Sequence, residues 1–148
     1  FLRLNCTYES SENNIDDLTI ESRNDNGWEK LDLNIRSPGF LLFINGLFSC
    51  QHLYMRTNSA ERNLILESAT GDLQVMTNEA WRIQSAIVRF NVKLKSGLPT
   101  KDDINYIIDR MGHCPVSTNL PDSIELVKTV NFDRQVQRTA NLPCDGLS

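Results

Sequence analysis

Two cysteines stand in settings that favour thiol chemistry. Cys50 lies in a long apolar segment, and Cys114 directly precedes Pro115. Because proline is favoured at the first position of a helix, Cys114 is predicted to be the N-cap of a short helix. The free N–H groups there favour a thiolate, the reactive form of cysteine. The alternative for both positions is structural, because a free cysteine is commonly a small buried apolar residue.

The two histidines, His52 and His113, each lie within two positions of one of these cysteines, which suggests a zinc site. Cys50 and His52, however, are two positions apart on a predicted helix. Their side chains therefore point to nearly opposite sides and cannot bind one tetrahedral ion. We expect no metal and no other cofactor.

The other two cysteines have less distinctive surroundings. Cys6 lies on the apolar face of the first predicted strand, where a core position is expected. Cys144 lies in a polar C-terminal segment without hydrophobic periodicity, and we assign it no role.

The composition predicts one acidic domain. The chain has 148 residues, of which 40% are hydrophobic and 23% charged, and its net charge is −4. It has no run of Lys and Arg, so we expect no nucleic-acid partner. Its longest apolar stretch, residues 39–50, is shorter than the roughly 20 residues that cross a bilayer, so we expect no membrane span. The first residues show no signal-peptide core, and we expect a cytoplasmic protein.

Hydrophobic periodicity predicts strands first and then a helix. Apolar residues alternate in three segments, around residues 2–8, 18–20 and 31–35, which predicts a three-stranded antiparallel meander. From about residue 40 to 57 the pattern is apolar nearly all round, which predicts a buried central helix opened by Pro38. Helical spacing places Cys50 on a face with the following residues, so its thiol is expected to point inward or into a pocket: Phe43, Gly46, Leu47, Leu53 and Tyr54.

The second half of the chain again predicts strands followed by a helix, and then one more strand. Residues 64–76, with an interruption at Gly71-Asp72, and residues 83–95 predict a hairpin of two long strands. Thr100 is expected to cap an amphipathic second helix that stops near Gly112. A last strand is predicted around 124–130, and residues 133–148 are expected to be irregular.

Two segments resemble the OsmC/Ohr group of thiol peroxidases: SPGFLLFINGLFSC, which ends at Cys50, and HCPVSTNL, which contains Cys114. The order of the predicted elements is similar as well. The resemblance implies an α+β, OsmC-like fold with a single domain over residues 1–132 and an irregular tail over 133–148. It also implies an intertwined homodimer with two active sites near the subunit interface.

The resemblance further implies an antioxidant, thiol-dependent peroxidase. Cys50 would attack an organic or inorganic hydroperoxide and become a sulfenic acid. Cys114 would then close a disulfide, and an external dithiol would reduce it. An arginine before the helix would favour the thiolate of Cys50, and Arg36 is the nearest candidate, with Lys30 also possible.

The sequence departs from this family pattern at one position. Leu41 stands where the family carries the glutamate that orients the activating arginine, and no acidic residue lies between Ile35 and Cys50. We therefore expect a less activated Cys50 thiol than in members with both groups. The alternative function is a non-catalytic domain that keeps the fold and either binds a small apolar ligand or serves only as a dimeric module.

Overall fold

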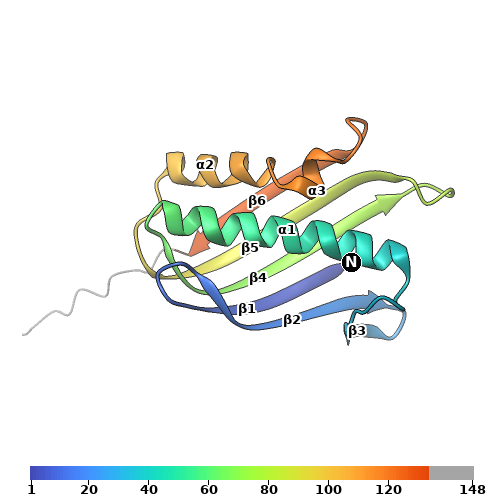
Figure 1. Cartoon of the computed structure of the whole chain (residues 1–148), viewed down its shortest axis with the longest axis horizontal. Coiled ribbons are helices and arrows are strands. Elements are labelled where there is room, and N and C mark those ends of the chain that lie inside the picture. The colour runs from blue at the N-terminus through green and yellow to red at the C-terminus, as the bar shows by residue number, and fades with distance from the viewer. Residues whose placement is uncertain (134–148) are drawn as a thin grey trace, which may run out of the picture.

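The computed structural model describes residues 1–133 as one six-stranded sheet with helices on one face (Figure 1). Its N-terminal part is an antiparallel meander of β1 (Leu2–Glu9), β2 (Asn14–Asn24) and β3 (Gly27–Lys30). The predicted meander is confirmed, but its third strand is earlier than expected. The turn at Asp25-Asn26 leads directly into Gly27, whose φ of +115° suits glycine. The chain then leaves the sheet edge, and Ile35 is 92% exposed.

The remaining elements follow in the predicted order. They are α1 (Gly39–Glu61), β4 (Ile65–Thr77), β5 (Ile83–Ser96), α2 (Lys101–Met111), α3 (Pro115–Thr118) and β6 (Glu125–Asp133). The strand order is β3-β2-β1-β4-β5-β6, with β4 and β5 forming the predicted hairpin and β6 running parallel to β5. The α+β fold is confirmed. The predicted tail and Cys144 lie outside the described residues, apart from Asp133, which ends β6.

Local signals explain the start and end of α2. The hydroxyl of Thr100 accepts a hydrogen bond from the backbone N–H of Asp103, and the carboxylate of Asp103 accepts one from the N–H of Thr100. This reciprocal pair is a capping box. Ile107 and Met111 face the core, and the helix ends at the predicted Gly112. The end of α2 therefore fixes where the chain enters α3, whose N-cap is Cys114.

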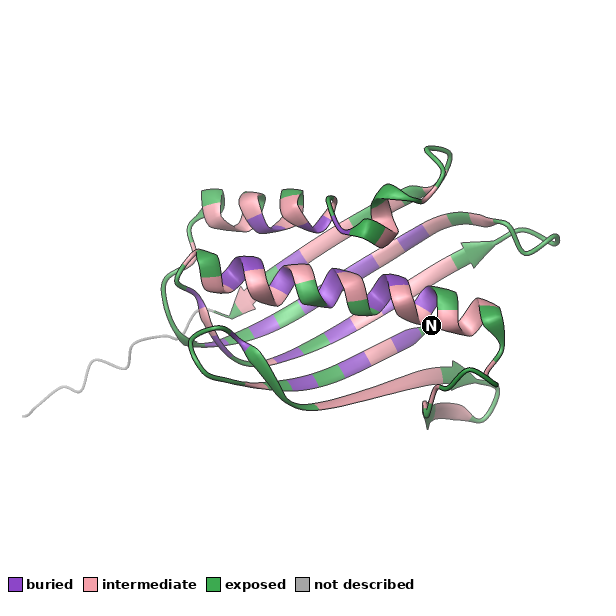
Figure 2. Ribbon diagram, in the orientation of Figure 1, coloured by how far each residue is buried: buried purple, intermediate pink, exposed green. Residues whose placement is uncertain are grey.

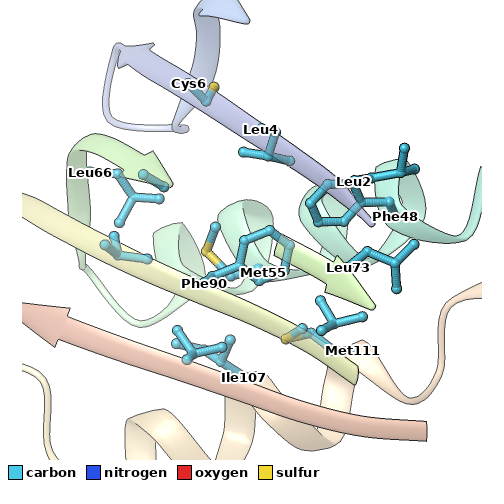
Figure 3. Packing of buried hydrophobic residues seen from close by; sticks show 14 of the residues in the cluster. Leu2, Leu4, Cys6, Phe48, Met55, Leu66, Leu73, Phe90, Ile107 and Met111 are labelled. Atoms are coloured by element: carbon cyan, nitrogen blue, oxygen red, sulfur yellow. The ribbon is translucent and has the colours of Figure 1, made fainter. Parts of the chain in front are cut away.

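The core lies between the sheet and the helices (Figure 3). The ring of Phe48 on α1 stacks on that of Phe90 on β5, with centroids 5.9 Å apart. Alternate residues of β5 are buried, as the sequence predicts, and the residues between them are mostly exposed. The amphipathic pattern of this strand thus fixes which sheet face the helices cover.

Gly71 does not interrupt β4, contrary to the sequence-based expectation. It lies inside the strand, opposite Leu4 of β1 and Phe90 of β5. A Cβ atom at Gly71 would lie 2.7 Å from Cε1 of Phe90 and 3.1 Å from Cγ of Leu4. The glycine is therefore required by close packing of the neighbouring side chains, and the strand continues through it.

The helix α1 is covered on one side only, which corrects the expectation of a helix buried all round (Figure 2). Its buried stripe consists of Ile44, Leu47, Phe48, Gln51, His52, Met55, Asn58 and Ser59. Phe43 and Leu53 are 45% and 41% exposed. The reason is that one sheet with two further helices covers only part of the circumference. In the described part of the chain, no helix has both the length and the hydrophobicity to span a membrane.

Replacing Gly71 by alanine should lower the free energy of unfolding by about 1–3 kcal/mol, because the added methyl group overpacks a buried site. Urea unfolding followed by circular dichroism measures the change. Gly39→Ala is the matched control, since a Cβ at Gly39 meets nothing within 4 Å. Equal stabilities of the two variants would contradict the packing role of Gly71.

Candidate thiol site

Cys114 lies at the N-cap of α3, as the sequence predicts. Pro115 follows as the first helical residue, and the Sγ of Cys114 accepts a hydrogen bond from the backbone N–H of Ser117 at 3.3 Å. The hydroxyl of Ser117 is 3.0 Å from the same sulfur. The side chain of Cys114 is fully buried. The local C-P-V-S sequence thus places two hydrogen-bonding groups of one residue on a buried sulfur.

Gln51 brings a third group to this sulfur from α1. Its Nε2 donates toward the carbonyl oxygen of Met111 at 2.9 Å, the Sγ of Cys114 at 3.2 Å and the hydroxyl of Ser117 at 2.5 Å. The residue is fully buried, and its Oε1 has no hydrogen-bond partner within residues 1–133. A buried, unpaired Oε1 costs stability, so the hydrogen bonds of Nε2 are expected to offset that cost.

Cys50 precedes Gln51 on α1, and its side chain also lies beside Cys114. Its thiol interacts with the thiol of Cys114 through a side-chain hydrogen bond and with the backbone at Val116. Unlike Cys114, it is only partly buried. The structure therefore brings together the two cysteines that the sequence singled out, one shielded from solvent and one accessible to it.

The surroundings shift the pKa values of the two thiols in opposite directions. Burial raises the pKa of Cys50, and the adjacent Cys114 raises it further, against the lowering effect of the hydrogen bond at Val116. Burial by itself would raise the pKa of Cys114 as well. Hydrogen bonds from Ser117, Cys50 and Gln51 outweigh it and lower the pKa of Cys114 below its ordinary value. The pair titrates as a unit, and its first negative charge resides mainly on Cys114.

The cationic residues considered from the sequence lie before α1. Arg36 is exposed in the turn that precedes the helix, where its backbone N–H donates to the side chain of Asn34. Lys30 ends β3, opposite Glu21 of β2. Leu41, at the position of the family glutamate, packs partly buried against the core. Besides burial, the groups that shift the pKa of Cys50 are Val116 of α3 and Cys114 at its N-cap.

The remaining cysteine and histidine side chains lie elsewhere. Cys6 is buried in the core, as expected. His52 points to the β1 side of α1, where its Nε2 is 2.6 Å from the hydroxyl of Tyr8, and burial with the charge of Arg56 lowers its pKa to about 4. His113 is exposed, with its Nδ1 2.9 Å from the carbonyl oxygen of Asp109. His52 is therefore neutral near pH 7.

Gln51 and Ser117 were not selected from the sequence, although each leaves a signal. Ser117 is three residues after an N-cap, the position whose backbone N–H bonds to the cap side chain. Gln51 is a polar residue in an apolar helix, spaced four residues from both Leu47 and Met55 of the buried stripe. A polar residue on a buried stripe needs a partner, but the sequence does not show which one.

Solved structures share this arrangement of sheet and helices. An OsmC-like protein from Mycoplasma pneumoniae superposes with a TM-score of 0.55 at 10% identity, over 78% of this chain and 89% of that one. An OsmC-like protein of unknown function from Vibrio cholerae gives 0.51 at 15% identity, over 76% and 83%. The chain has the OsmC-like fold. No protein-family model and no curated protein matches it.

A third structure agrees with this assignment. It is a putative osmotic stress induced and detoxification response protein from Psychrobacter arcticus, with a TM-score of 0.52 at 13% identity, covering 78% of this chain and 80% of the other. At such identities the likeness establishes the OsmC-like fold and leaves the chemistry to the residues present in this chain. These residues are the Cys50–Cys114 pair with Gln51 and Ser117.

The apparent pKa of Cys50 should fall when Cys114 is replaced by serine, because the serine carries no negative charge beside it. The pH dependence of Cys50 alkylation, read by peptide mass mapping, measures it in a Cys6→Ser/Cys144→Ser background. Restoring Cys6 is the control and should leave the midpoint unchanged. A midpoint that stays in place or rises in the Cys114→Ser protein would show that Cys114 does not control Cys50.

Proposed function

We propose that this protein is a thiol-dependent hydroperoxide reductase in which Cys50 attacks the peroxide and Cys114 resolves the product to a disulfide. The observation that carries the proposal is the contact between a partly accessible thiol and a shielded thiol of lowered pKa. The first suits a reaction with an external oxidant, and the second suits attack on the oxidised partner. The OsmC-like fold supports the assignment by analogy.

The proposed reaction needs no group beyond the two thiols, a peroxide and a dithiol. The thiolate of Cys50 attacks the distal peroxide oxygen, the O–O bond breaks, and an alcohol or water leaves after protonation. The resulting sulfenic acid is attacked by Cys114, which forms the disulfide and releases water. An external dithiol then reduces the disulfide. Two electrons pass in this way from the dithiol to the peroxide.

The raised pKa of Cys50 has a consequence for the rate. At neutral pH most Cys50 is protonated, because burial and the adjacent Cys114 raise its pKa. Only the thiolate is a strong nucleophile, so the reactive fraction grows as the pH rises toward the pKa. Arg36 remains a proposed contributor to this site, since an arginine near Cys50 would favour the thiolate.

A second candidate function is the binding of a small apolar ligand by a non-catalytic domain. A pocket of about 150 Å³ lies between α1 and the β1–β2 hairpin, and its lining is largely apolar, including Leu4, Leu18, Ile20 and Leu53. The absence of an acidic side chain at Leu41 also favours this alternative. The two candidates differ in the fate of added peroxide, which only the enzyme consumes.

The protein should consume an organic hydroperoxide such as cumene hydroperoxide in the presence of dithiothreitol, and faster at alkaline than at neutral pH. Cys50→Ser should reduce consumption to the level of buffer, because it removes the nucleophile. Cys6→Ser is the matched control and should keep the wild-type rate. Peptide mapping after mild peroxide treatment should find Cys50 joined to Cys114. Unchanged consumption by Cys50→Ser would contradict the proposal.

We also propose a homodimer through the outer face of α1, defined here by Phe43, Gly46 and Leu53. This face is apolar yet partly or largely exposed in one chain, and a Cβ at Gly46 would meet nothing within 4 Å. A second chain seated there would bury the exposed side chains of Phe43 and Leu53.

Light scattering should therefore give about twice the 16.9 kDa of one chain. Phe43→Glu combined with Leu53→Glu should shift the protein toward the monomer, because burying two carboxylates at an apolar contact is costly. Met76→Glu, a like substitution at an exposed apolar residue of β4, should leave the dimer intact. A wild-type protein with the mass of one chain would rule out the dimer.

A further inference from the structure

The hydrogen bonds around Cys114 are more numerous than its position at a helix start requires. The backbone N–H of Ser117 is the bond expected of an N-cap residue. The hydroxyl of Ser117 at 3.0 Å and the amide of Gln51 at 3.2 Å are added by side chains, the second from a different helix. Sulfur is a weak acceptor as a thiol and a much better one as a thiolate. The site is thus built for the charged form of Cys114.

The orientation of the Gln51 amide is fixed by a third residue. The carbonyl oxygen of Met111, 2.9 Å from Nε2, accepts only from the nitrogen side of the amide. If the amide were turned over, Oε1 would face this carbonyl oxygen, two acceptors with no hydrogen between them. The observed orientation leaves Oε1 unpaired in the described part of the chain and directs an N–H group at Cys114.

The two sulfurs also differ in how an outside molecule can reach them. Cys114 is fully buried, whereas Cys50 is partly accessible. In a disulfide between them, an incoming thiolate can attack only the sulfur of Cys50. The sulfur of Cys114 is then the leaving group, and a thiol of lower pKa leaves faster.

We propose that Gln51, with Ser117, is a positioning residue that holds Cys114 as the thiolate that closes the disulfide on Cys50 and that leaves when the disulfide is reduced. This inference rests on the proposed peroxide-reducing function. It adds a role for Gln51 and a direction to the reduction step, with Cys50 as the sulfur that the external dithiol attacks.

The electrons balance in both steps. In closure, the Cys114 thiolate attacks the Cys50 sulfur, the S–S bond forms, and the S–O bond of the sulfenic acid breaks to give hydroxide, which takes up a proton. In reduction, one thiolate of the external dithiol bonds to Cys50, and the S–S bond breaks with its electron pair going to Cys114. The second thiol of the dithiol then displaces Cys50 and leaves as part of an oxidised dithiol.

The charged and titratable groups near Cys114 are consistent with this role. From α1 the facing titratable group is Cys50, which donates a hydrogen bond to Cys114. His113 turns away to the Asp109 carbonyl, and on β6 the ammonium of Lys128 lies beside Gly112, 3.0 Å from where a Cβ atom of that residue would be. Burial of Cys114 opposes its ionisation, so the hydrogen bonds from Gln51, Ser117 and Cys50 are needed to stabilise the thiolate.

The direct test titrates Cys114 as the sole cysteine. In a Cys6→Ser/Cys50→Ser/Cys144→Ser protein, the ultraviolet absorbance of the thiolate follows its ionisation without any reagent entering the buried site. Gln51→Met keeps the size and removes the amide, and Ser117→Ala removes the hydroxyl. Both substitutions should move the titration midpoint to higher pH. Ser59→Ala is the matched control, because it removes a buried hydrogen bond from the same helix far from the thiols.

A second measurement separates this inference from the proposed function. With all cysteines present, the rate of Cys50–Cys114 disulfide formation after a peroxide pulse should fall about tenfold or more at neutral pH in Gln51→Met, and recover as the pH rises. Cys50 sulfenic acid, trapped with dimedone, should accumulate. A merely structural role would lower stability but would leave both the titration midpoint and the pH profile of closure in place.

The outcomes are distinct. Midpoints of Cys114 that do not move in Gln51→Met and Ser117→Ala would overturn the role of these residues, whether or not the protein consumes peroxide. Midpoints that rise, together with slowed closure that alkaline pH restores, would establish it. A wild-type protein that forms no Cys50–Cys114 disulfide with peroxide would overturn the proposed function and with it the steps assigned here to Cys114.

Discussion

The buried amide of Gln51 is the interaction on which the arrangement of the thiol site depends. It joins α1 to the last turn of α2 through Met111, and to α3 through Cys114 and Ser117. Without such a link, the short segment between α2 and β6 would be held mainly by apolar contacts, which do not fix orientation. Hydrogen bonds are directional, so this amide sets where the sulfur of Cys114 lies relative to Cys50.

The chemistry of the pair follows from unequal burial within one polar cluster. Cys114 is more buried than Cys50, and burial alone would make it the weaker acid. Its hydrogen bonds reverse that order, and the charge they favour then raises the pKa of Cys50. The uncharged Leu41 fits this arrangement, because the interactions that lower a thiol pKa here act on Cys114 and come from Ser117, Cys50 and Gln51.

Much of the fold could be predicted because its determinants are local. The alternation in β5, the capping box at Thr100 and the C-P sequence at Cys114 each act within a few residues. The predictions that were wrong concern neighbours distant in the chain. Gly71 looked like a break in β4, yet Phe90 and Leu4 require a residue without a side chain there. Helix α1 looked buried all round because its composition does not show how many layers cover it.

For the candidate site, the sequence by itself determined the two cysteines and the helix start at Cys114, since Pro115 and Ser117 act on their own turn. Only the tertiary structure decided that Gln51, on a helix far earlier in the chain, donates to that sulfur, and that Cys50 is the accessible member of the pair. The physical reason is that helical periodicity shows which residues share a face but not what packs against it. The pKa order of the two thiols depends on that packing.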